Sequence, residues 1–220
     1  MRATILASAA VFLSVGLLSA HVAAGDQHET KGVEPRNVYF EVGPAFGLGL
    51  STSGLGAGPA LGLDVGTRLR LGSGGLAVHL RTQYQRYGKS GSVNAPCAVP
   101  TATGPCIQEG KLDYDLSEQS LDFGLRLAYQ FLPVGDRFFP YAGVAPKLFL
   151  LKSTVTSLGQ DNKDVSTSVG FAAFGGAAMT LGPGHVFGEL EYQWGGLSHP
   201  ITGDAHLAGF ALVLGYRLSL

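Results

Sequence analysis

Charged residues and cysteines are scarce in this sequence, and long apolar helices are absent after its N-terminus. Asp, Glu, Lys and Arg make up 14% of the 220 residues, well below the roughly 25% of an average soluble domain. The net charge is −1, without a block of like charge, which argues against a nucleic-acid partner. Lipid offers the backbone no hydrogen-bond partners, so a membrane protein without spanning helices has to be a closed β-barrel.

The N-terminus has the features of an export signal. Arg2 precedes an apolar run over Ile5–Leu18, and small residues at Val22–Ala24 offer a cleavage site. The run is shorter than the ~20 residues that a spanning helix needs. We predict a cleaved signal peptide over residues 1–24, a polar periplasmic lead over 25–36 and one barrel domain over 37–220.

The rest of the chain alternates between apolar and small or polar residues, which indicates strands. At the C-terminus, Phe210, Leu212 and Leu214 share one face and Ala211 and Val213 the other. Similar segments lie at 38–50, 61–71, 76–85, 121–130, 141–150, 167–181, 189–194 and 209–220. The faces of 167–181 cannot be assigned, because Ala and Gly dominate that segment. Most segments are long enough for the ~9–11 residues of a tilted membrane strand, so we predict an all-β, eight-stranded antiparallel up-and-down transmembrane barrel.

The connections between these segments alternate in length. Short Gly- and Pro-rich turns are predicted at Gly72–Gly75, Pro133–Arg137 and Gly182–His185. Longer polar loops are predicted at Ser51–Gly58, Gly88–Lys111, Thr154–Val165 and Gly195–Ala205. Short periplasmic turns and long outer loops are typical of bacterial barrels, so both termini are expected in the periplasm.

The direction of the apolar face separates a membrane barrel from a secreted lipocalin-like carrier, which hides that face around a ligand. The opposite face is rich in Gly and Ala, which suits a narrow lumen better than a solvated surface. Its charges nearly balance, as buried charges must. The predicted lumen ion network comprises Glu41, Asp64, Arg68, Arg70, Arg81, Asp122, Arg126, Lys147, Glu189, Glu191 and Arg217.

Aromatic residues gather toward the segment ends, as in the interfacial girdles of membrane barrels. One girdle is predicted from Tyr39, Phe40, Tyr129, Phe131, Phe138, Phe139 and Tyr216, and the other from Tyr84, Tyr87, Tyr192 and Trp194.

The C-terminus resembles the signal that the barrel-assembly machinery of Gram-negative bacteria reads. Gly215, Leu218 and Leu220 fit this pattern, whereas Val213 is not polar and the last residue is not aromatic. Pro140–Ala145 is similar to a strand opening of the OmpA/OmpX-like superfamily, the outer membrane protein beta-barrel domain. The resemblance implies an eight-stranded barrel in the bacterial outer membrane, with Glu41, Arg126, Lys147 and Arg217 inside.

Cys97 and Cys106 are the only cysteines and lie in the longest predicted loop. In an oxidising compartment they are expected to form a disulfide that braces the loop. Neither a C-x-x-C motif nor a neighbouring His supports a redox or metal site, and no cofactor or metal is expected.

Evidence for catalysis is weak. Ser198, His199, Asp204 and His206 loosely resemble a Ser–His–acid set, but a triad is defined by geometry. Gly54, Gly56 and Gly58 precede no helix and cannot form a phosphate loop. The chain is not expected to be an enzyme.

The predicted function is structural or surface-interacting, such as adhesion or host-factor binding through extracellular loops, with a lumen plugged by ion pairs. A small-solute channel is the alternative, and a lipid-acting enzyme comes third. Expected partners are outer-membrane lipid, the assembly machinery and an extracellular ligand, for a monomeric barrel.

Overall fold

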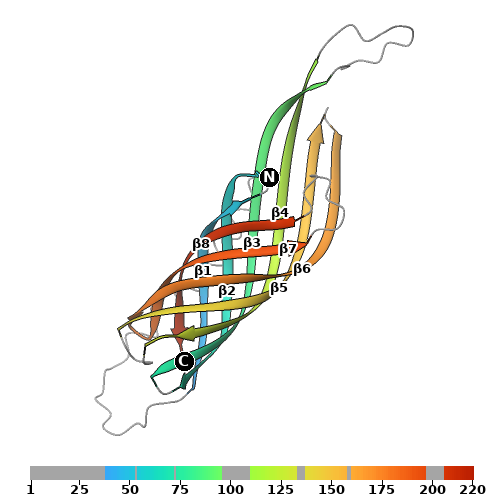
Figure 1. The fold of residues 1–220 in the computed structure, drawn as a ribbon. Helices are drawn as coiled ribbons and strands as arrows, with labels where there is room; N and C mark the ends of the chain where they lie inside the picture. Colours follow the sequence, from blue (N-terminus) through green and yellow to red (C-terminus); the bar gives the residue numbers. More distant parts are fainter. Residues whose placement is uncertain are drawn as a thin grey trace, which may run out of the picture.

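The computed structural model describes residues 38–52, 54–71, 73–95, 110–132, 137–157, 160–196 and 206–220. These residues form eight antiparallel strands that close into one barrel, β8 pairing with β1 (Figure 1). The strands are β1 (Val38–Ser51), β2 (Ala57–Leu71), β3 (Gly74–Ala95), β4 (Gly110–Gln130), β5 (Phe138–Ser157), β6 (Gln160–Leu181), β7 (Gly184–Gly196) and β8 (His206–Ser219). The predicted fold class is confirmed.

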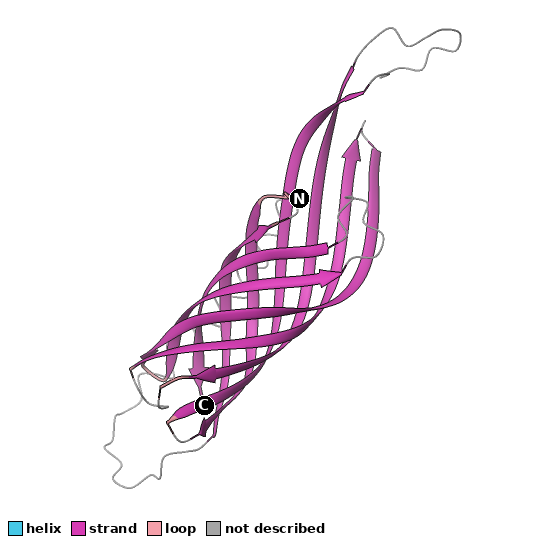
Figure 2. Ribbon diagram, in the orientation of Figure 1, coloured by secondary structure: helices cyan, strands magenta, loops and turns pink. Residues whose placement is uncertain are grey.

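All elements of the described residues are strands (Figure 2). These residues contain no helix that could span a membrane. The predicted signal peptide and periplasmic lead lie outside the described residues.

The side chains alternate across the barrel wall, with the large apolar ones outside. On β8, Leu214 is 59% exposed, whereas its neighbour Val213 is 2% exposed. The interior instead holds acids, bases and amides, including Asp64, Arg81 and Glu191. Because the apolar face points away from the lumen, the secreted-carrier alternative is excluded.

Strand β6 follows the same rule, although its sequence did not show it. Ser168, Ala172, Phe174 and Ala178 are buried inside. Val165, Val169, Phe171 and Met179 are exposed on the outer face. The faces of this strand are therefore set by closure of the barrel between β5 and β7.

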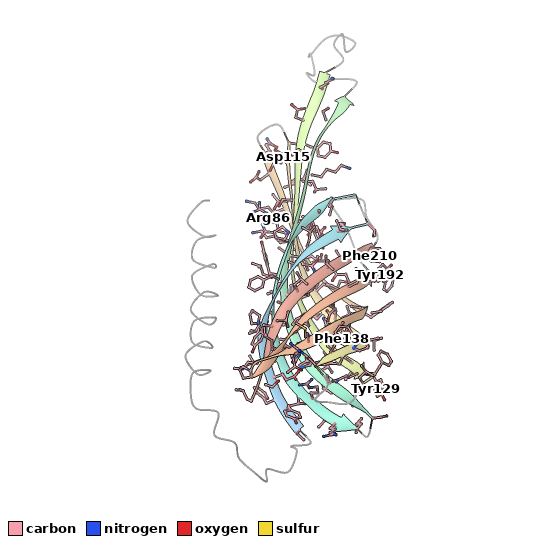
Figure 3. The ribbon with its side chains drawn as sticks, turned by 90° about the vertical axis from the view of Figure 1, so that its left-hand side faces the viewer. Arg86, Asp115, Tyr129, Phe138, Tyr192 and Phe210 are labelled. Atoms are coloured by element: carbon pink, nitrogen blue, oxygen red, sulfur yellow. The ribbon has the colours of Figure 1, made fainter. Side chains whose placement is uncertain are left out.

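The aromatic girdles differ in part from the prediction. Tyr129 and Phe138 lie outside near one end of the barrel, and Tyr192 and Phe210 lie outside farther along it (Figure 3). Tyr87 and Phe139 point inward, with only 2% and 4% of their surface exposed. Their assignment to the girdles was wrong because strand parity, not proximity to a strand end, decides the face.

Four strands extend beyond the rest of the barrel (Figure 1). β3 to β6 contain 20 to 22 residues, whereas the other four contain 13 to 15. Much of Gly88–Lys111 and Thr154–Val165, predicted as loops, continues these strands as antiparallel hairpins. Their many Ser, Thr and Gly residues hide the alternation, but backbone pairing holds them as strands. We call this four-stranded part, residues 86–95, 110–119, 152–157 and 160–165, the extension.

The β1–β8 seam that closes the barrel is interrupted at Pro44. The register pairs Val42 with Leu218 and resumes with Ala45 opposite Gly215, because proline cannot donate a ladder hydrogen bond. The backbones approach closely here. A Cβ on Gly43 would overlap the carbonyl oxygen of Tyr216 and lie 2.8 Å from the Cα of Arg217.

Gly43→Ala is therefore expected to lower the yield of folded barrel, because overpacking at the seam should destabilise the folded state by about 1–3 kcal/mol. Heat-modifiable migration on a gel measures the folded fraction. Gly175→Ala is the control, since its Cβ would meet only the Tyr141 carbonyl oxygen at 3.8 Å. Equal yields for both variants would contradict the argument.

Candidate functional site

The lumen contains ion pairs at three levels, starting at the end that carries the short turns. At the first level, Glu41 of β1 forms an ion pair with Arg68 of β2, whose Nε lies 2.9 Å from one carboxylate oxygen. His79 Nε2 of β3 lies 2.9 Å from the other oxygen of Glu41, and His185 Nδ1 of β7 lies 3.9 Å from the first. One carboxylate thus joins four strands.

The second level is centred on Asp64 of β2. Arg81 donates to both carboxylate oxygens of Asp64, at 2.5 and 2.7 Å. Arg217 of β8 donates to the same group from its Nε at 2.9 Å. Arg81 also donates across the lumen to Glu189 of β7 at 2.8 Å. Bidentate Arg–carboxylate pairs are among the stronger hydrogen-bonded contacts in proteins.

The third level is centred on Glu191 of β7. Arg126 donates to Glu191 at 2.8 Å and lies 2.6 Å from Glu189. Lys147 donates to the other oxygen of Glu191 and, at 3.0 Å, to Gln193. Asp122 lies 3.9 Å from the Lys147 ammonium. Together these contacts connect strands β4, β5 and β7 through the interior.

Aromatic rings cover the cations of this network. The guanidinium of Arg126 lies 3.6 Å from the ring centroid of Phe174, and that of Arg217 lies 3.9 Å from the centroid of Phe187. A cation above a ring face is stabilised by the ring quadrupole. The Tyr141 hydroxyl donates to Glu189 at 3.1 Å. Charges, rings and amides therefore share the space inside the barrel.

All the predicted lumen residues except Arg70 take part in these pairs. Arg70 is exposed at the rim and joins no ion pair among the described residues. Without it, the network holds five acids and five bases, and such a balance limits the penalty of burying charge. The prediction omitted His79, His185, Gln85 and Gln193, although the parity of β3 and β7 already directed them inward.

Little free space remains at the first level. A cavity of about 20 Å³, lined by residues that include Glu41, His79, His185 and Arg217, lies there. This volume accommodates about one water molecule.

The extension forms a second candidate site outside the closed part of the barrel. A polar open hollow of about 560 Å³ is lined by Ser90, Gly91, Ser92, Asp113, Tyr114, Asp115, Thr156 and Ser157. Next to it, the Thr156 hydroxyl donates to Asp161 at 2.8 Å and lowers the pKa of that carboxyl. Lys163 lies 3.5 Å from Asp161 and lowers its pKa further.

Several predicted residues cannot be placed. Cys97, Cys106, Ser198, His199 and Asp204 lie outside the described residues, and His206 is described only as the first backbone position of β8. The proposed assembly signal occupies the end of β8. There a Cβ on Gly215 would lie 2.5 Å from the Phe187 ring, and Leu220 is exposed.

Comparison with known proteins agrees with this architecture. The family model for the outer membrane protein beta-barrel domain matches residues 10–217. The chain belongs to this family. This beta-barrel protein is therefore located in the bacterial outer membrane. Among curated proteins, none matches the chain.

Solved structures of other outer-membrane barrels are similar to this beta-barrel domain at low sequence identity. A major outer membrane protein from Thermus thermophilus is 13% identical with a TM-score of 0.52, over 84% of this chain and 100% of the other. Neisserial surface protein A is 17% identical with a TM-score of 0.43, over 84% and 98%. The N-terminal barrel domain of Pseudomonas aeruginosa OprF is 16% identical with a TM-score of 0.41, over 85% and 100%. At these identities the likeness concerns the fold.

Proposed function

We propose that this protein is a monomeric, non-conducting outer-membrane barrel whose extension binds a ligand outside the cell. The observation that carries the proposal is the extension itself. A tilted strand crosses the bilayer in ~9–11 residues, yet β3 and β6 each contain 22. The surplus is polar and includes the hollow around Asp113, Tyr114 and Asp115.

The two sides of the extension support the same role. Pairing of β2 with β3 ends at Ala60 and Gln85, and pairing of β6 with β7 ends at Gly170 and Gly195. Just beyond these pairs, Gly58 of β2 still lies against Arg86 and Gly196 of β7 against Ser168. Farther out, no described strand pairs with the outer edges of β3 and β6. Free backbone N–H and C=O groups at a sheet edge offer hydrogen bonds to a partner. In this proposal the end of β8 is read by the assembly machinery, and no enzymatic activity is assigned.

Shortening the extension tests the binding role. In the variant, residues 89–116 and 154–163 are each replaced by Asn-Gly, a sequence that favours tight hairpins. Cells that carry the wild-type barrel are expected to adhere to a basement-membrane extract, and cells that carry the variant are expected to lose this adhesion. The variant should still show a heat-dependent gel shift, because the apolar belt and the lumen pairs are untouched. Equal adhesion of both strains, or no adhesion by the wild type, would refute the proposal.

The closed lumen predicts the electrical behaviour of the purified barrel. In planar bilayers we expect no sustained single-channel current, because eight strands enclose only enough room for side chains and ion pairs occupy that room at three levels. A 16-stranded porin measured in the same bilayers is the positive control. Stable open-channel currents from the wild type would favour the small-solute channel instead.

A further inference from the structure

The outward face of the barrel is uncharged over a length that matches the membrane. On β3 the outward positions from Leu76 to Tyr84 are apolar or Thr, and on β4 those from Leu121 to Tyr129 are apolar. Each stretch is close to the ~9–11 residues that a tilted strand needs to cross the hydrocarbon. Outward-facing positions of β1, β2, β7 and β8 contain no Lys, Arg, Asp or Glu within the described residues.

The first outward charges beyond this belt are both positive and lie in one row. Gln119 of β4 pairs with Arg86 of β3 on one side and with Lys152 of β5 on the other. Adjacent strands are ~4.8 Å apart, which places the Arg86 and Lys152 backbones about 10 Å from each other. Tyr84, Leu121 and Leu150 occupy the row beneath, at the edge of the apolar belt.

These two cations have no acidic neighbour on their face. Both are exposed, and neither joins an ion pair among the described residues. The nearest outward acids, Asp115 and Asp161, lie farther out, in the row of Ser90 and Thr156. Figure 3 shows Arg86 beyond the level of Tyr192 and Phe210, with Asp115 farther along the extension. Lys163, by contrast, is already paired with Asp161.

We infer that Arg86 and Lys152 bind the phosphate of a glycolipid headgroup in the outer leaflet of the membrane. A side chain that leaves the apolar belt at this level reaches the headgroup layer, where anionic groups attract Lys and Arg. Arg forms bidentate pairs with phosphate, and Lys contributes a point charge. Gln119 between them supplies an amide donor. The inference rests on the orientation in the proposed function, with the extension outside the cell.

Lipid retention in native mass spectrometry tests this site. The barrel is extracted in detergent and titrated with diphosphoryl lipid A, with dephosphorylated lipid A or with phosphatidylglycerol. We expect the wild type to prefer diphosphoryl lipid A, and the double variant Arg86→Gln/Lys152→Gln to bind it about 10- to 30-fold more weakly. Arg86→Lys, which keeps the charge, should retain most of the binding.

A matched control removes the same charge elsewhere on the extension. Lys89→Gln/Lys111→Gln changes two exposed lysines outside this row, one on the face of β3 opposite to Arg86 and one near the outer end of β4. This variant should bind as the wild type does. The inference would be overturned if this control lost lipid binding to the same degree, or if the Arg86/Lys152 variant bound diphosphoryl lipid A as the wild type does. Displacement of the lipid by inorganic phosphate would also overturn it. So would equal binding of dephosphorylated lipid A, or a preference for phosphatidylglycerol. The adhesion experiment uses other residues, so either proposal can fail alone.

Discussion

Leu214→Arg is expected to abolish assembly of the barrel. Leu214 lies on the outward face of β8, between the exposed Leu212 and the half-buried Tyr216. An arginine near the middle of the hydrocarbon destabilises a membrane barrel by about 2–4 kcal/mol. This loss is a large fraction of the free energy of unfolding of a small domain, so the folded band on an unboiled gel should almost disappear.

The control variant introduces arginine at another outward-facing position, which lies on the extension outside the apolar belt. Val165 is 74% exposed on the extension, opposite Lys152. Val165→Arg should therefore assemble with normal yield. Normal assembly of Leu214→Arg would mean that the face of β8 assigned here to lipid does not meet lipid.

Arg81→Met is expected to give the second large effect, a loss of about 3–5 kcal/mol in the free energy of unfolding. The substitution removes the two hydrogen bonds from Arg81 to Asp64 and the one to Glu189, and leaves Arg217 as the donor to Asp64. Asp64 and Glu189 then lose a buried cationic partner, and an uncompensated buried charge is strongly destabilising. Urea unfolding in lipid vesicles, followed by the gel shift, measures the change.

Arg70→Met is the matched control for Arg81→Met, because Arg70 is exposed and joins no ion pair among the described residues. Surface substitutions of this kind usually change stability by less than ~0.5 kcal/mol. Similar midpoints for wild type, Arg70→Met and Arg81→Met would show that the Asp64 level contributes little to stability.

Much of the wall could be predicted from the sequence because a strand has a period of two. That period assigned Leu214 outward and Glu191, Arg126 and Arg217 inward, in agreement with their positions in the structure. The choice of ion-pair partners could not be predicted. Arg81 and Asp64 face each other in the register of β2 and β3, but the Arg81–Glu189 contact crosses the lumen. Such contacts depend on the stagger of all eight strands.

The extension was missed for a different reason. Most of its described side chains are exposed or half-buried on both faces of the sheet, so no apolar period marks them as strands, and Gly88–Lys111 read as a loop. Pairing along β3 and β4 continues to Ala95 and Gly110. The distinction between a long loop and a long hairpin lies in backbone hydrogen bonds, which composition does not record.

The length of these hairpins also constrains the order of events during biogenesis. In the proposed orientation, the polar tips of β3–β4 and β5–β6 have to reach the far side of the bilayer. Once Asp64, Arg81, Glu189 and their partners have met in the interior, their ion pairs tie β2, β3, β7 and β8 together across the lumen. We therefore expect translocation of both tips to precede the docking of β8 against β1, and that docking to be the last step of insertion.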